Sequence, residues 1–252
     1  MTSNVLGRVA RLNGTASAVS AAAAATGAGI GRRLLSSIVC EGTVPHGLEL
    51  YPDFFTPQEE KDMLSELTRN RWSSERDDAD VKRKMANLLG RTLKTLPVTH
   101  RVIQRAVDQG CLREFPDGSQ LNKYPSNGCI PFHVDARGIG ASICMFSFQS
   151  SSLLDMIPTT DLTDEHNAMS AEEVLALGGC RLLLEPRSLL VLRHDARYHW
   201  AHRVPSAPTF TINNRTYTRA ERFSLVFWST KLDPNAPPIK RHPDATSRIR
   251  LT

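Results

Sequence analysis

The chain has 252 residues, of which 40% are hydrophobic and 23% charged, and this composition is that of a globular protein rather than a fibre or a disordered chain. No apolar run approaches the roughly 20 residues that a membrane-spanning helix needs. Four of the five net positive charges are arginines of the first 40 residues, so the rest of the chain is close to neutral and lacks the basic surface expected of a duplex-DNA-binding protein.

The N-terminal segment, residues 1–40, contains arginine, serine, alanine and threonine but no acidic residue. This composition is typical of a mitochondrial transit peptide, in which arginines lie along one face of an inducible helix. A low-complexity tail without a targeting role is the alternative. We therefore expect a disordered leader over residues 1–40, one folded domain over 41–232, a basic tail over 233–252, and a mitochondrial location.

A helix is predicted to begin at the sequence Thr56-Pro57-Gln58-Glu59. Threonine fits the N-cap, proline the first helical position, and glutamate the third position of a capping box. This helix should continue to about Arg69, and residues 48–55 before it indicate a short strand.

A second amphipathic helix is expected over about 98–109, where Gly110 ends it. The polar and basic residues 70–97 between the two helices are expected to form a solvated helix and loop surface, rather than a patch that binds nucleic acid.

Beyond Gly110 the pattern changes to short β-rich runs separated by proline, glycine and polar turns. The predicted strands are GSQLNKYP, ASICMFSFQSS, CRLLLE, SLLVLR and RFSLVFWST. Residues 155–178 are expected to leave the sheet and to include a small helix near AEEVLAL. Helices followed by strands predict two N-terminal helices packed on an antiparallel sandwich or barrel.

The five cysteines contain no CxxC pair, and their number is odd. They predict neither a zinc knuckle nor a disulfide framework, and they fit a reducing compartment.

The segment His133-Val134-Asp135 is the candidate metal site. In a strand, residues i and i+2 face the same way, so His133 and Asp135 can bind one ion while Val134 points into the core. A second imidazole would complete the two-histidine, one-carboxylate set that binds non-haem Fe(II). A surface turn is the alternative, because His-x-Asp alone recurs by chance.

Two further motifs accompany this segment. Asn122-Lys123-Tyr124 precedes it, and residues 182–204 contain an apolar strand followed by an Arg-Tyr pair and then His202. With these motifs, the sequence resembles the AlkB family of Fe(II)/2-oxoglutarate-dependent dioxygenases over roughly residues 48–231. His202 stands at the family position of the second iron histidine; His166, His194 and His199 are rival ligands.

The resemblance implies a double-stranded β-helix, or jelly-roll, core that is mainly β with N-terminal helices. It also implies an oxidoreductase that uses Fe(II), 2-oxoglutarate as cosubstrate and O2. The implied metal ligands and catalytic residues are His133, Asp135 and His202. The residues implied to bind 2-oxoglutarate are Asn122, Tyr124 and Arg222.

Strand alternation supports the expectation for Arg222. In RFSLVFW, alternation places Arg222, Ser224, Val226 and Trp228 on one face of the strand. A guanidinium among apolar neighbours is costly unless a carboxylate pairs with it. The resemblance implies that the C5 carboxylate of 2-oxoglutarate is this partner.

Two departures from the family pattern bear on binding and substrate. Trp228 stands where the family usually has a second arginine that helps to hold the cosubstrate, and Lys231 or Arg219 could supply that charge instead. The sequence Ala136-Arg137-Gly138 replaces acidic residues with which DNA-repair members help to read a damaged base.

The expected function is hydroxylation or oxidative demethylation of a protein or RNA substrate in mitochondria. Modification of tRNA or other RNA, or demethylation of nucleic acid, is the alternative within the same chemistry. A catalytically silent barrel that acts as a binding module is a second alternative, and Trp228 favours it. A cupin-like barrel that binds Zn or Mn without 2-oxoglutarate is a third.

Overall fold

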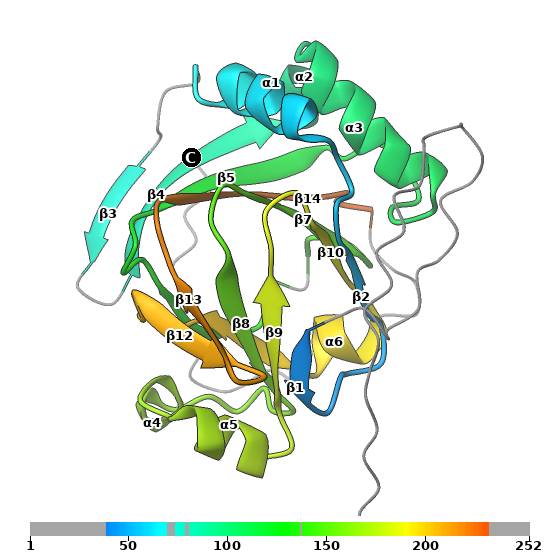
Figure 1. Cartoon of the computed structure of the whole chain (residues 1–252). Helices are drawn as coiled ribbons and strands as arrows, with labels where there is room; N and C mark the ends of the chain where they lie inside the picture. The colour runs from blue at the N-terminus through cyan, green and yellow to red at the C-terminus, as the bar shows by residue number, and fades with distance from the viewer. Residues whose placement is uncertain (1–38, 70–73, 79–80, 137, 232–252) are drawn as a thin grey trace, which may run out of the picture. The chain divides into compact units, whose positions relative to one another are not determined.

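The structure is a computed structural model that describes residues 39–69, 74–78, 81–136 and 138–231. Two antiparallel sheets form most of the described part, as Figure 1 shows. The five-stranded sheet has the order β1 (Cys40–Gly42), β9 (Cys180–Leu184), β8 (Ser152–Ile157), β11 (Ala201–Val204), β6 (Ile130–His133).

The seven-stranded sheet supplies the other wall. Its order is β2 (Leu48–Tyr51), β10 (Leu189–Leu192), β7 (Ile143–Phe148), β14 (Arg222–Trp228), β5 (Gly118–Tyr124), β4 (Val81–Leu89), β3 (Ser74–Asp78). A separate hairpin joins β12 (Thr209–Ile212) to β13 (Arg215–Thr218). This mainly antiparallel β-architecture confirms the predicted jelly-roll fold class.

Helices α1 (Pro57–Leu67), α2 (Gly90–Leu93) and α3 (Pro97–Asp108) follow the predicted N-terminal pattern. The capping box of α1 is formed, because Thr56 Oγ1 accepts from the Glu59 amide at 3.1 Å and Glu59 accepts from the Thr56 amide at 3.0 Å. Glu59 also accepts from Arg105 of α3 at 2.7 Å. One carboxylate therefore caps α1 and ties it to α3.

Two hydrophobic cores lie on opposite faces of the seven-stranded sheet. The first joins α1 and α3 to this sheet, where Phe223, Leu225 and Phe227 of β14 point toward the helices. The second lies between the two sheets and includes Leu154 of β8 and Leu190 of β10. Burying each such side chain contributes about 1.5 to 3 kcal/mol. Because side chains alternate along β14, the predicted face with Arg222, Ser224, Val226 and Trp228 is turned toward the space between the sheets.

One sequence prediction is wrong and a second is correct except at its start. Residues 70–97 are predicted to form helix and loop, but the described part of this range contains β3 and β4, and β4 pairs with β5. Residues 155–178 are predicted to leave the sheet, and the chain does so from residue 158 on, because β8 continues to Ile157. The predicted small helix is present as α5 (Ala171–Ala176), after the short α4 (Asp164–Asn167).

The predicted leader and tail lie outside the described residues, except for Val39 and Cys40; Cys40 already belongs to β1, which pairs with β9. None of the described helices has the length and apolar character needed to cross a membrane.

Candidate metal centre

The three predicted ligands meet where β6 and β11 pair. His133 ends β6, and His202 lies directly opposite it on β11, with 4.3 Å between the ring centroids. Asp135 follows two residues after the strand, and its carboxylate lies 3.7 Å from Nε2 of each histidine. One ligand atom from each of the three lies within 4.8 Å of the others. Such a cluster can bind one metal ion.

The expectation for the segment around Asp135 needs one correction. The strand ends at His133, so Asp135 reaches the site from the segment after β6 rather than from the strand itself. Val134 packs beside Phe132, as predicted, but it also lines the cavity described below.

Hydrogen bonding at His133 and burial at His202 leave a ring nitrogen of each histidine suited to a metal. Nδ1 of His133 lies 2.9 Å from the carbonyl oxygen of Pro131, and a carbonyl only accepts, so Nδ1 carries the proton. Its Nε2 is then free to bind an ion. Burial is the main cause that lowers the pKa of His202 to about 4, and the electrostatic effect of the neighbouring His133 is the second cause. The His202 imidazole is therefore neutral at physiological pH, and a neutral imidazole is the form that binds metals.

The donor set also suits the metal that the resemblance implies. Two imidazoles and one carboxylate, without sulfur, are typical ligands of non-haem Fe(II). Among the described residues, no second group of three histidine, cysteine or acidic ligand atoms lies so close together. His166 contacts Thr163, and His194 stacks on His46, so these rivals lie elsewhere.

Arg197 fixes the segment that carries Asp135. It lies in α6 (His194–Tyr198), is 1% exposed, and donates to the backbone carbonyls of Asp135 at 3.0 Å and Ala136 at 2.6 Å. A planar guanidinium with two such bonds restrains both residues. Sequence analysis placed the Arg-Tyr pair in the motif but did not identify this role, which depends on contacts between residues about 60 positions apart.

A cavity of about 310 Å³ opens beside the three ligands, between the sheets. Its wall is mostly apolar on the side formed by Leu154, Leu190, Leu192 and Val204. Asn122 and Tyr124 of β5, which the resemblance implies as cosubstrate-binding residues, also line it. The cavity is thus a largely apolar space with a polar wall and a candidate metal site.

Arg222 is not among the residues that line this cavity, but it contacts the wall. It lies opposite Tyr124 in the β14–β5 register, and its guanidinium is 5.4 Å from the centre of the Tyr124 ring. The residue is 1% exposed, and Nη2 donates to Ser147 Oγ at 2.9 Å.

Two nitrogens of Arg222, Nε and Nη1, are buried without a hydrogen-bond partner. Burial lowers the pKa of Arg222 to about 10, so the group is still a cation at neutral pH. A buried cation with unused donors and no carboxylate partner among the described residues is suited to bind an anionic ligand such as 2-oxoglutarate.

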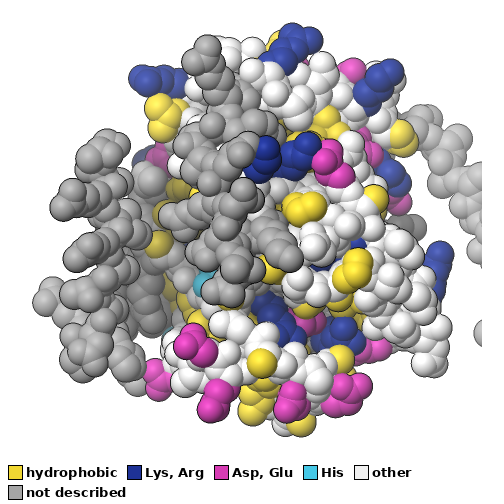
Figure 2. All heavy atoms as spheres, turned by 90° about the vertical axis from the view of Figure 1, so that its left-hand side faces the viewer, with side chains coloured by type: hydrophobic (Ala, Val, Ile, Leu, Met, Phe, Trp, Pro, Cys, Tyr) yellow, Lys and Arg dark blue, Asp and Glu magenta, His cyan; other side chains and the backbone are white. Residues whose placement is uncertain are grey.

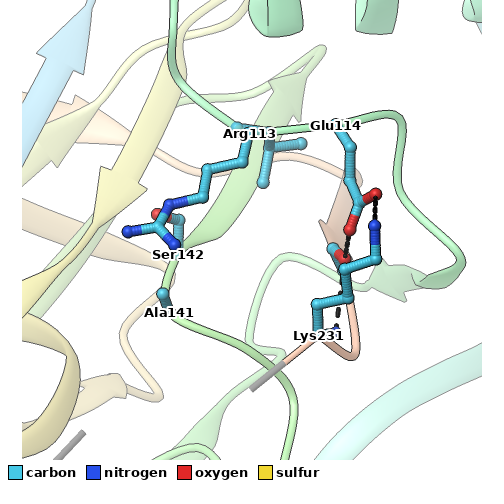
Figure 3. A pocket seen from close by; sticks show the side chains of 7 residues that line it. Arg113, Glu114, Ala141, Ser142 and Lys231 are labelled. Carbon is cyan, nitrogen blue, oxygen red and sulfur yellow. Dashed lines mark hydrogen bonds and ion pairs between the residues drawn. The ribbon is translucent and has the colours of Figure 1, made fainter. Parts of the chain in front are cut away.

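Neither of the two cations expected to replace the second arginine lies at the cavity. Arg219 is buried and donates to the carbonyls of Pro205, Ala207 and Gly128. Lys231 pairs with Glu114 in a separate pocket of about 270 Å³, shown in Figure 3. Neither residue lines the cavity, so the structure gives no direct support to either suggestion.

Trp228 itself lines the cavity and packs against Gly118, where a Cβ atom would lie 2.6 Å from the indole nitrogen. The cation that the structure does place in the wall is Arg83 of β4. Sequence analysis missed it, because residues 70–97 were interpreted as a solvated surface.

Comparisons with known proteins agree with this architecture. No family model matches the chain. Over 196 residues, it is 22% identical to the uncharacterized protein L905 of Acanthamoeba polyphaga mimivirus, covering 72% of this chain and 84% of that protein. It is 24% identical to an Arabidopsis thaliana protein named alkylated DNA repair protein ALKBH8 homolog, covering 75% of this chain and 59% of the relative.

A third relative is the Xenopus tropicalis protein named tRNA (carboxymethyluridine(34)-5-O)-methyltransferase alkbh8, which is 24% identical over 66% of this chain but only 26% of its own length. The solved structure of OsALKBH1 superposes with a TM-score of 0.51 at 16% identity, covering 74% of this chain and 100% of that one, and supports the fold. The chain is thus similar in sequence to proteins named as AlkB homologues and similar in fold to OsALKBH1.

Proposed function

We propose that the protein is an Fe(II)- and 2-oxoglutarate-dependent dioxygenase that hydroxylates or oxidatively demethylates a protein or RNA substrate in mitochondria. The observation that carries this proposal is the cluster of His133, Asp135 and His202 within 4.8 Å beside a cavity whose wall contacts an uncompensated buried arginine, Arg222. A metal ion would bind to the three clustered ligands, and a carboxylate ligand would pair with Arg222.

In this proposal, the three ligands hold Fe(II), which when bound supplies the oxidation of a substrate C–H bond with O2 and 2-oxoglutarate. The residues of the chain bind and orient. Arg222 and Ser147 offer donors to a carboxylate, while Asn122 and Tyr124 orient the cosubstrate from the adjacent strand. The apolar wall excludes water, which strengthens these polar contacts.

The substrate class rests on charge and on the relatives. Outside residues 1–40 the sequence is close to neutral, which argues against a duplex-DNA substrate. Figure 2 shows acidic side chains gathered at the lower end of one face, where α4 and α5 carry Asp164, Glu165, Glu172 and Glu173. The name of the Xenopus relative supports RNA, including tRNA, as the alternative to protein. The mitochondrial location rests on the composition of residues 1–40 alone.

Succinate formation tests the chemistry. The full chain is incubated with Fe(II), ascorbate, O2 and 2-oxoglutarate, beside the His133→Ala variant. Iron-dependent succinate from the wild type, and its loss in the variant, is the expected result.

The other possible results separate the alternatives. No succinate above the variant, even with mitochondrial RNA and protein added, would contradict the proposal and favour a silent barrel that binds a partner. Metal-dependent turnover that needs no 2-oxoglutarate and is unaffected by Arg222→Ala would favour the Zn or Mn barrel.

Stimulation of succinate formation identifies the substrate class. A mitochondrial extract is divided and treated with ribonuclease or with protease before it is added. Loss of stimulation after ribonuclease alone identifies RNA, and loss after protease alone identifies protein. Formaldehyde released in proportion to succinate distinguishes demethylation from stable hydroxylation.

A further inference from the structure

Arg83 is a cation inside the cavity. It lies on β4, lines the cavity wall, and donates through Nη1 to Asn122 Oδ1 at 3.0 Å. Its Nε is buried without a hydrogen-bond partner. The side chain therefore reaches inward from the sheet, and part of its donor capacity is unused.

The charges around the cavity are unbalanced. Among the described residues that line it, Arg83 is the only lysine or arginine and Asp135 the only acid, and Asp135 faces the two histidines. The polar partner of Arg83, Asn122, is neutral. Among the residues whose side chains the structure describes, which exclude those of β3, no carboxylate lies within ion-pair distance of Arg83 or of Arg222. Enclosed guanidinium groups of this kind are stabilised when an anion binds between them.

The strand register places the two arginines on either side of one tyrosine. Arg222 of β14 is directly opposite Tyr124 of β5. On the other side of β5, Lys84 pairs with Lys123, and continuing this register by one residue places Arg83 opposite Tyr124 as well. Directly opposite residues share a face of the sheet. The two α-carbons are then about 10 Å apart, two strand spacings, with Tyr124 between them.

We propose that Arg83 is a second cationic anchor for 2-oxoglutarate, acting with Arg222 across Tyr124; this inference rests on the proposed function. The cosubstrate is a dianion, and two guanidinium groups with free donors match its charge better than one. Asn122, held by Arg83, is thereby oriented in the wall that the cosubstrate contacts. The neutral Trp228 on the same face adds no charge.

Calorimetric titration of 2-oxoglutarate into the full chain loaded with Mn(II) tests the inference, because Mn(II) fills the metal site without turnover. The variants are Arg83→Gln, which removes the charge, and Arg83→Lys, which retains it without the planar fork. The matched control is Lys84→Gln, which removes the same charge from the adjacent, exposed position of β4. The Mn(II) affinity of each variant is measured separately.

Arg83→Gln should weaken 2-oxoglutarate binding roughly ten- to hundredfold, the range for a lost charge-assisted contact, with Mn(II) affinity unchanged. Arg83→Lys should recover part of the loss, and Lys84→Gln should stay within about twofold of wild type. Unchanged 2-oxoglutarate affinity in Arg83→Gln would overturn the inference while leaving the proposed function intact.

Equal losses of Mn(II) and 2-oxoglutarate affinity in both Arg83 variants would also overturn it, because Arg83 would then shape the whole cavity. Failure of the Mn(II)-loaded wild type to bind 2-oxoglutarate would instead contradict the proposed function itself.

Discussion

His202 belongs both to the packing between β6 and β8 and to the candidate metal centre. It lies half-buried between its neighbours on β6 and β8, and the loss of hydration there lowers its pKa from 6.5 to about 4. In the unfolded chain the same histidine titrates near its ordinary value. Between these two pH values, only the unfolded state of the metal-free protein gains the proton.

The free energy of unfolding of the metal-free protein should therefore fall as the pH drops from 6.5 to 4, and His202 should contribute roughly 3 kcal/mol of this decrease. Urea unfolding between pH 4.5 and 7 measures it, with His202→Gln as the comparison. The variant should have a shallower pH dependence. Equal slopes in both proteins would show that His202 titrates normally in the folded state.

The buried charge of Arg222 is expected to lower the free energy of unfolding, while it leaves a cation available to bind 2-oxoglutarate. Its guanidinium is 1% exposed, and two of its nitrogens have no partner. Replacing an uncompensated buried charge by an apolar side chain of similar volume is often stabilising by about 1 to 4 kcal/mol. Arg222→Met should therefore unfold at an equal or higher urea concentration than wild type, yet lose the stabilisation that 2-oxoglutarate gives the Mn(II)-loaded protein.

Urea unfolding with and without 2-oxoglutarate measures both effects. A variant that is several kcal/mol less stable without ligand would contradict this interpretation, and would mean that the contacts with Ser147 and Met145 make Arg222 a structural residue.

The short helix α6 acts on the metal centre from outside it. Arg197 of this helix holds the carbonyls of Asp135 and Ala136 and so restrains one ligand. Residues that orient metal ligands typically account for a 10- to 100-fold difference in metal affinity. Arg197→Met should weaken Mn(II) binding at least about tenfold, and Arg197→Lys should fall between it and wild type.

Electron paramagnetic resonance of free Mn(II) during titration measures this affinity, and urea unfolding of the same variants serves as the control. Wild-type Mn(II) affinity in a folded Arg197→Met variant would show that the segment keeps its position without this contact.

Helix α1 provides the contrasting case of an element that stabilises the fold away from the site. Thr56→Ala removes the side-chain half of its capping box and should cost about 1 kcal/mol of unfolding free energy. Mn(II) affinity should not change, because α1 packs on the face of the seven-stranded sheet opposite the cavity. A parallel loss of metal affinity would show that the helix layer controls the site.

These elements differ in how far the sequence predicts them. The start of α1 is predicted at the correct residue, because a capping box is a local pattern. Strand β4 is missed, because its lysines and arginines obscure the alternation in which Ala86 and Leu88 are buried. Its partner β5 lies about 35 residues further along the chain, so the pairing that turns Arg83 toward the cavity is not a local feature.

In the whole molecule, the two sheets bring together side chains that are distant in the sequence. His133 and His202 come from the five-stranded sheet, whereas Asn122, Tyr124 and Arg222 come from the seven-stranded one. The motifs nominated these five residues and Asp135; the structure brings the three candidate metal ligands together and places Asn122 and Tyr124 in the cavity wall, while the binding roles stay predictions. The motifs did not predict the unpaired nitrogens of Arg222 or the position of Arg83, because both depend on packing between strands.

The three candidate metal ligands and the cavity wall near Arg83 and Arg222 can form one binding site. In that case the metal and 2-oxoglutarate must bind cooperatively. Equilibrium dialysis of radiolabelled 2-oxoglutarate against the full chain, with and without Mn(II), measures this directly beside His133→Ala. We predict that Mn(II) tightens 2-oxoglutarate binding at least about tenfold in the wild type, a coupling of roughly 1.4 kcal/mol, and has no effect in the variant. Equal 2-oxoglutarate affinity of the wild type with and without Mn(II) would contradict a shared site.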